Sequence, residues 1–297
     1  MTHTHRARSR RALGLVLALT VAYTGAEIVG GLLTGSLALL ADAGHMLGDS
    51  AALALALGAA WLATRPATPE RSFGFRRAEI LAALANGLAL VAIAIWVFVE
   101  AIRRLDDPPH VLGGWMLLVG VIGLGVNVAA AVILARTAEE NLNVQAAFRH
   151  VLADLAASVG VAVAAIVILI TGWQQADPIA GLAIALLIFA SSWTILRDSV
   201  AILLEATPAS IDAEEVGRRM AEAEGVVEVH DLHIWTITSG FPALSAHVLV
   251  RRGDDCHARR RELEHLLTSE FRLTHTTLQV EHAGENEGLQ ITTLPPR

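Results

Sequence analysis

Two pairs of histidine and aspartate residues stand four positions apart inside long apolar stretches of the sequence. The first pair is His45 and Asp49, and the second is His150 and Asp154. A spacing of four places both side chains of a pair on one face of a helix, about 6 Å apart. Two such faces turned toward each other supply two imidazole nitrogens and two carboxylate oxygens. That set suits a tetrahedral Zn²⁺ site, whereas Mg²⁺ and Ca²⁺ prefer oxygen ligands alone.

Ionisable side chains inside a membrane span are costly, by about 2.5–3.5 kcal/mol each on insertion scales, and they usually face the interior of a helix bundle. The alternative is that each pair is an unrelated helix-capping or interfacial pair, and the duplication of the pattern argues against it. Asp42 precedes His45 by three positions, so it lies near the same face but farther toward the outer end of the span. We expect Glu27 to be interfacial or paired with an arginine.

The composition indicates that these pairs belong to a membrane protein. Of 297 residues, 54% are hydrophobic and 17% are charged, against about 25% charged residues in an ordinary soluble domain. A bilayer core of about 30 Å needs roughly 20 apolar residues at 1.5 Å each. Six stretches meet that length, and they are 12–33, 37–63, 79–102, 112–135, 146–170 and 178–203. We therefore expect a bundle of six transmembrane helices.

The arginines predict the orientation of this bundle, because cytoplasmic loops carry an excess of basic residues. All 22 basic residues are arginine. The side that carries both termini holds Arg6, Arg8, Arg10, Arg11, Arg65, Arg71, Arg76, Arg77, Arg136, Arg149 and Arg197. The opposite side holds only Arg103 and Arg104. The prediction is a multi-pass protein of the plasma (inner) membrane with both termini in the cytoplasm.

The last third of the chain differs in charge and in periodicity. From Val200 onward, 16 acidic residues stand against 9 arginines, which argues against nucleic acid as a partner. A single cysteine, Cys256, excludes a disulfide framework. The pattern predicts a helix over 213–224, strands over 226–238 and 243–252, a helix over 256–271 and a strand over 275–282. This α-β-β-α-β order is typical of a small sheet covered by two helices, a compact α+β domain.

We thus expect a cytoplasmic N-terminal arm at 1–11, a transmembrane domain at 12–206, a cytoplasmic domain at 207–283 and a disordered tail at 284–297. Several motifs stand in a specific order along these parts. They are Ala41–Ser50, Ser72–Glu79, Asn141–Asn143 leading to His150, Asp177–Pro178 and His230–Trp235. In this combination the chain resembles the cation diffusion facilitator family, in particular its bacterial zinc, cobalt and cadmium exporters.

The resemblance implies a homodimeric, six-helix cation/proton antiporter with a metallochaperone-like cytoplasmic domain. It implies that His45, Asp49, His150 and Asp154 are the transport ligands and that Zn²⁺ is the leading substrate, with Co²⁺ and Cd²⁺ as further candidates. It also implies a cytoplasmic zinc site at His230, His247 and His282, with His257 or Cys256 as a bridging ligand. By the same resemblance, Arg77 pairs with Glu205.

Three functions compete for the four intramembrane ligands. A transporter holds a cation reversibly, and because metal binding requires unprotonated histidine, cation entry displaces protons. A membrane-anchored metal sensor, whose cytoplasmic domain binds Zn²⁺ and signals to a partner, has no use for four costly buried groups. An intramembrane hydrolase needs an open zinc position and a nucleophile, which this set does not offer. We therefore predict a secondary transporter in the lipid bilayer rather than an enzyme.

Overall fold

A computed structural model describes the chain at residues 2–135 and 142–284, with side chains described from Val16 onward except at 136–147, 149–150 and 153. The disorder expected at the C-terminus therefore concerns residues outside the described part. The chain divides into two compact units, residues 1–57 with 82–196 and residues 58–81 with 197–297. Each unit is described by itself below.

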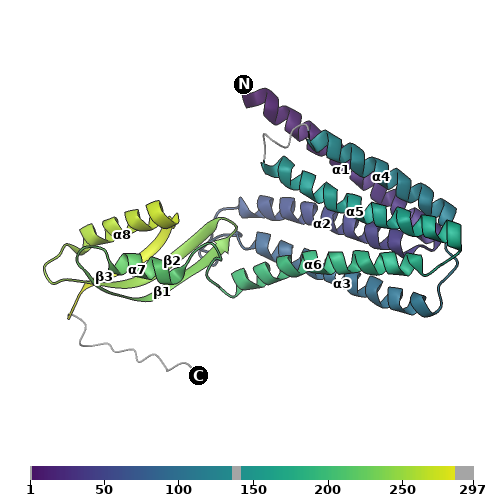
Figure 1. The fold of residues 1–297 in the computed structure, drawn as a ribbon. Helices are drawn as coiled ribbons and strands as arrows, with labels where there is room; N and C mark the ends of the chain where they lie inside the picture. The colour runs from purple at the N-terminus through teal and green to yellow at the C-terminus, as the bar shows by residue number, and fades with distance from the viewer. Residues whose placement is uncertain (1, 136–141, 285–297) are drawn as a thin grey trace. The chain divides into compact units, whose positions relative to one another are not determined.

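Six long helices follow one another in the order expected from the apolar stretches (Figure 1). They are α1 (Thr2–Thr34), α2 (Leu37–Ala63), α3 (Ala78–Asp106), α4 (Gly113–Ala135), α5 (Leu142–Thr171) and α6 (Ala176–Leu203). In length and composition, the described part of each is sufficient to cross a membrane. The predicted six-helix bundle is confirmed.

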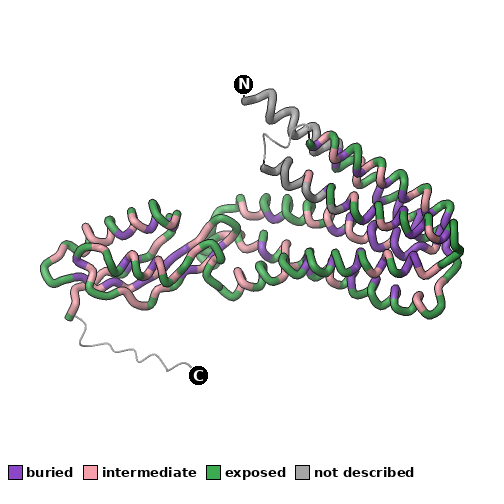
Figure 2. The backbone as a smooth tube through the Cα atoms, viewed as in Figure 1, coloured by how far each residue is buried: buried purple, intermediate pink, exposed green. Residues whose placement is uncertain are grey.

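The helices expose large apolar side chains and bury carboxylates, the reverse of a water-soluble fold. Leu33 and Ile170 are 74% and 78% exposed, whereas Glu27 and Asp42 are 0% and 1% exposed. Figure 2 shows the buried positions gathered on the sides that the helices turn toward one another. Apolar surface of this extent needs a lipid solvent, and polar groups in such a bundle face its interior.

Glycines on α1 let neighbouring helices approach closely. A Cβ atom on Gly30 would lie 2.9 Å from Cγ2 of Val119 on α4, and one on Gly31 would lie 2.8 Å from Leu40 on α2. Small residues at helix contacts are the usual device for close packing in membranes. These contacts place α1 against both α2 and α4.

Asp177, the second residue of α6, holds the start of α2. Its carboxylate accepts hydrogen bonds from Ser36 Oγ at 2.6 Å and from the backbone N–H groups of Leu37 at 2.7 Å and Ala38 at 3.2 Å. The first N–H groups of a helix have no partner within it, so a buried carboxylate at that point is stabilising. This contact fixes the helix that carries His45 to α6.

The C-terminal domain contains α7 (Ala213–Ala221), β1 (Val226–Thr238), β2 (Phe241–Val250), α8 (Cys256–Phe271) and β3 (His275–His282). This order confirms the predicted α+β domain. The sheet order is β1-β2-β3, with β1 antiparallel and β3 parallel to the central β2. Parallel pairing of β2 and β3 follows from the helical connection, because α8 carries the chain back along the sheet.

Both helices of this domain cover one face of the sheet. Alternate residues of β2, namely Leu244, Ala246, Val248 and Val250, form one buried cluster with Val216 and Met220 of α7 and Leu263 and Leu267 of α8. Residues at i and i+2 of a strand share a face, so this cluster defines the covered face. The other face of β2 carries His247.

The expected pair of Arg77 and Glu205 is present in the second unit. Arg77 Nη2 lies 2.9 Å from Glu205 Oε1, and both side chains are exposed. Two residues farther along, Glu79 accepts a hydrogen bond from Thr238 Oγ1 at 2.7 Å. The start of α3 is thereby joined to the segment after α6 and to β1.

Candidate metal centre

Three of the four expected transport ligands converge inside the bundle. His45 and Asp49 come from successive turns of α2, and Asp154 comes from α5. One ligand atom from each lies within 4.8 Å of the other two. His45 Nδ1 is 3.6 Å from Asp49 Oδ2, and His45 Nε2 is 3.7 Å from Asp154 Oδ1. The imidazole therefore stands between carboxylates of two different helices.

Both separations are longer than direct hydrogen bonds and can be compared with those between the ligands of a zinc ion. With metal–ligand bonds of about 2.0–2.1 Å, two ligands of a tetrahedral zinc ion stand about 3.4 Å apart. One zinc ion binds a single ring nitrogen of His45, so either the 3.6 Å separation from Asp49 or the 3.7 Å separation from Asp154 is comparable with that value. The remaining carboxylate offers an oxygen within the 4.8 Å that encloses all three groups. Asp154 is 5% exposed, whereas His45 and Asp49 are partly exposed, so a cation here would be buried on the side of α5. The donor set of nitrogen and oxygen fits a divalent ion of the zinc type.

The fourth expected ligand, His150, lies on α5 one turn before Asp154. Its side chain is outside the described residues. That it shares a face of α5 with Asp154 stays a prediction from the spacing of four residues.

A hydrogen bond between helices supports Asp154 from the next turn. Asn127 of α4 donates from Nδ2 to Ser158 Oγ of α5 at 3.0 Å, and both residues are buried. Asparagine commonly joins membrane helices in this way. On the other side of the site, a Cβ atom on Gly48 would lie 2.3 Å from Leu90 Cδ2 of α3. The site is thus held by contacts of α2 with α3 and of α4 with α5.

A second cluster lies on the sheet of the C-terminal domain. His230 and His247 are directly opposite each other on β1 and β2, and their ring centroids are 5.2 Å apart. Asp231 Oδ2 lies 3.7 Å from His230 Nδ1 and 3.8 Å from His247 Nδ1. The three residues form a group able to hold a metal ion, and all three are partly or largely exposed.

Sequence reasoning missed Asp231 as a member of this cluster. Adjacent residues of a regular strand point to opposite faces, so Asp231 should face away from His230. The register of β1 shifts between His230 and His233, and Asp231 has a φ of 48°. Such a bulge turns the side chain back toward its neighbour, and aspartate tolerates this left-handed backbone better than most residues. The only sign of Asp231 as a ligand in the sequence was its position directly after His230.

The structure does not bring His282 to this cluster. His247 stands opposite Gln279 of β3, whereas His282 stands opposite Val250, three residues farther along. An odd offset puts His282 on the opposite face, the one covered by the helices. There His282 Nε2 lies 3.5 Å from Cys256 Sγ at the start of α8 and 2.9 Å from the carbonyl oxygen of Asp254. His257 is exposed on the first turn of α8.

The fold defines a multi-pass helical membrane protein with a small α+β domain, and its bundle contains a cluster of side chains able to hold a cation. Comparisons with known proteins agree with this class. Residues 13–204 match the family model described as the cation efflux transmembrane domain, and residues 208–283 match the one described as the cation efflux protein, cytoplasmic domain.

Several curated bacterial proteins are similar over nearly the full chain. A cadmium, cobalt and zinc/H(+)-K(+) antiporter of Bacillus subtilis is 41% identical, with 96% of this chain and 94% of the relative covered. The zinc transporter ZitB of Escherichia coli is 42% identical and the efflux protein CzcD of Cupriavidus metallidurans 41%, each covering 95% of this chain and 90% of the relative. The chain therefore belongs to the cation diffusion facilitator family, whose members are metal cation transporters and not enzymes.

One solved structure is similar to the end of the chain. It is the metal-bound C-terminal domain of the CzcD transporter of C. metallidurans, 36% identical, with a TM-score of 0.23. The match covers 24% of this chain and 99% of the solved domain.

Proposed function

We propose that this protein exports Zn²⁺ from the cytoplasm in exchange for protons, by alternating access at His45, Asp49, His150 and Asp154. The observation that carries the proposal is the convergence of three of these ligands from α2 and α5 within 4.8 Å in an apolar bundle. Relatives named for zinc, cobalt and cadmium transport support Co²⁺ and Cd²⁺ as further substrates. Membership of the family supports a plasma (inner) membrane location, with both termini in the cytoplasm.

The position of His45 explains how a proton and a metal exclude each other. An imidazolium ion donates from both ring nitrogens, and each nitrogen of His45 faces one carboxylate oxygen, at 3.6 and 3.7 Å. Zn²⁺ needs the neutral ring, so its entry from the cytoplasm releases a proton. Exposure of the site to the outside, where protons are supplied, returns the proton and expels the metal. Zn²⁺ balances the two carboxylates of the site, whereas one proton on His45 leaves the site with a net charge of −1.

The C-terminal domain supports a second, cytoplasmic role for zinc. We place this metal at His230, Asp231 and His247, and we treat Cys256 and His282, with His257 nearby, as a separate pair of donors. The domain carries most of the protein's net charge of −7, so bound cations would reduce repulsion between two copies. We propose a homodimer whose two C-terminal domains approach each other when zinc binds.

Transport into proteoliposomes tests the proposal against its alternatives. With a pH gradient imposed across vesicles that contain the full chain, we expect zinc uptake coupled to proton flux. Asp49→Ala and His150→Ala should each abolish both fluxes, because each removes one of four ligands. The matched control is Asp107→Ala, which removes an exposed carboxylate between α3 and α4 and should leave both fluxes unchanged.

Two other outcomes would contradict the proposed function. Retained flux in both ligand variants would remove the site from the transport path. Zinc binding by the wild-type chain without any uptake would support the metal sensor instead.

A further inference from the structure

Two carboxyl groups outside the four transport ligands are buried between α1 and α2. Glu27 of α1 is 0% exposed and Asp42 of α2 is 1% exposed. Tyr23, one turn before Glu27, donates its hydroxyl to Glu27 Oε1 at 2.6 Å. The expectation that Glu27 is interfacial or paired with an arginine is wrong. The residue lies inside the bundle because α1 turns this face toward α2 and α4.

Three of the four oxygens of these carboxyl groups have no hydrogen-bond donor among the described residues. Glu27 Oε2 and both oxygens of Asp42 are buried and receive no hydrogen bond from the described residues. Glu27 and Asp42 nevertheless lie close enough to interact with each other directly. Two ionised carboxylates only accept hydrogen bonds and repel, so their contact requires a proton or a cation between them.

The surroundings make the full dianion unfavourable. Of the described ionisable side chains, those that act on the pair are Tyr23 from α1, Asp49 from α2 and Asp154 from α5, and all of them are acidic groups. The helix α4 contributes backbone and apolar contacts here and has no ionisable residue in Gly113–Ala135. A negative field in a medium of low dielectric favours capture of one positive charge.

The pair lies on one side of the metal centre along the membrane normal. Asp42 is five residues from the start of α2, about 7.5 Å along the helix, whereas Asp49 is twelve residues, about 18 Å, from it. Glu27 is seven residues from the end of α1, about 10 Å. Both carboxyl groups are thus nearer than Asp49 to the connection between α1 and α2, which the arginine count places outside the cell.

We propose that Glu27 and Asp42 share one proton, and that this proton is exchanged during transport in addition to the one on histidine. The inference rests on the proposed zinc/proton exchange. When Zn²⁺ occupies its ligands, its charge favours the ionised pair, so the shared O–H bond breaks and the proton leaves toward the side from which the metal came. After the metal leaves outward, the pair takes a proton from that side.

Proton counting on the full chain tests this pair. In weakly buffered detergent solution, an indicator dye measures the protons released for each Zn²⁺ bound. We expect Glu27→Gln and Asp42→Asn each to release about one proton fewer than the wild type, since the shared proton is lost. The double variant should lose no more than either single variant, because the pair holds only one. In all three variants, zinc affinity at high pH should stay within about twofold of the wild-type value. The pH dependence of that affinity should become shallower than in the wild type.

One control variant and three contrary outcomes separate this inference from its alternatives. Glu100→Gln removes a carboxylate paired with Arg104 on α3 and should leave the proton count unchanged. An unchanged count in both pair variants would overturn the inference while leaving zinc exchange intact. Loss of zinc binding at every pH, in variants that melt like the wild type, would overturn it in favour of carboxylates that bind the metal. A wild type that binds no zinc, or releases no proton, would instead refute the proposed function.

Discussion

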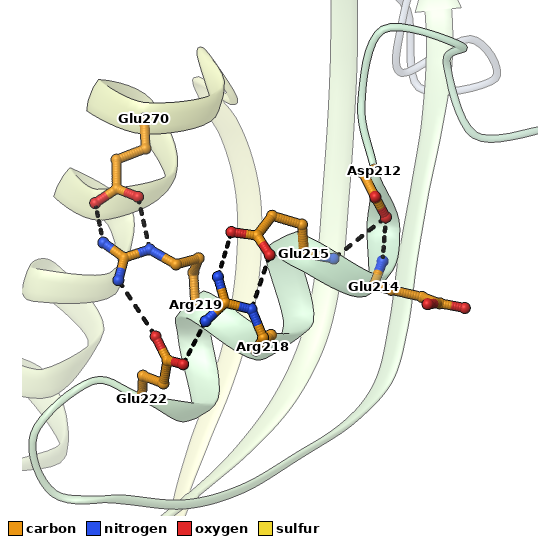
Figure 3. A network of polar contacts seen from close by, with 7 residues as sticks. All are labelled: Asp212, Glu214, Glu215, Arg218, Arg219, Glu222 and Glu270. Carbon is orange, nitrogen blue, oxygen red and sulfur yellow. Dashed lines mark hydrogen bonds and ion pairs between the residues drawn. The ribbon is translucent and has the colours of Figure 1, made fainter.

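Two aspartates begin the helices of the C-terminal domain. Asp212 accepts hydrogen bonds from the backbone N–H groups of Glu214 and Glu215, and Asp255 accepts those of Ala258 and His257. Figure 3 shows the first cap together with the ion pairs of α7, in which Arg219 reaches Glu270 of α8. Exposed ion pairs of this kind contribute little individually, whereas an N-cap satisfies donors that have no other partner. The caps therefore set where the helices start.

The cap of α8 predicts a stability that depends on pH. Hydrogen bonds from the backbone of Ala258 and His257 lower the pKa of Asp255 below its ordinary value. A lowered folded-state pKa means that the cap stabilises the domain above the unfolded-state value, near pH 4, and that this contribution is lost as pH falls through the folded-state value. At pH 7, Asp255→Ala should speed hydrogen exchange in the first turn of α8 several-fold in the full chain.

Asparagine separates the hydrogen bond from the charge in this test. Asparagine caps helices as well as aspartate does, so Asp255→Asn should exchange like the wild type at pH 7. Unlike the wild type, it should show no additional loss at acid pH. Equal exchange rates in the alanine and asparagine variants would assign the effect to the charge instead.

Gly48 lies at a close contact between α2 and α3, one residue before the expected metal ligand Asp49. An alanine there gains about 1 kcal/mol in helix propensity. Its Cβ atom would meet Leu90 Cδ2 at 2.3 Å, and Leu90 is buried, so that overpacking costs about 1–3 kcal/mol. We expect Gly48→Ala to lower the melting temperature and weaken zinc binding, because α2 must move away from α3.

The same helix offers a matched control. Gly58 is exposed, and a Cβ atom on it would meet no atom within 4 Å. Gly58→Ala should therefore keep or raise the melting temperature and leave zinc affinity unchanged. If both alanines behaved alike, packing of α2 against α3 would not determine the site.

Periodicity predicted the elements well and their faces less well. Strands 226–238 and 275–282 and helix 256–271 were predicted with the bounds observed, because alternation and capping residues mark them. The inward position of Glu27 was not predicted, since a helix that is apolar on all sides does not reveal its rotation. The separation of His282 from His247 depends on which residues of β2 and β3 stand opposite each other, and this parallel register has no local signal.

The whole chain combines an apolar bundle with an acidic C-terminal domain. Its six helices and its family make it a multi-pass membrane protein. The arginines predict which side of the membrane holds the acidic domain. The connection between α2 and α3 carries Arg65, Arg71, Arg76 and Arg77, whereas Arg103 and Arg104 are followed by Asp106 and Asp107. A cytoplasmic position, which the arginines predict, would let this domain bind the metal that the proposed transport removes.

Labelling of the only cysteine in the sequence tests this predicted orientation without introducing a new cysteine. Cys256 is partly exposed at the start of α8. A membrane-impermeant maleimide should label it in inside-out vesicles and leave it unlabelled in right-side-out vesicles, because the arginine asymmetry places the domain in the cytoplasm. Cys256→Ser gives the background in both preparations. Labelling of Cys256 in right-side-out vesicles would show that the topology is the inverse of the predicted one. It would also invert the direction of transport, since the pair of Glu27 and Asp42 would then face the cytoplasm.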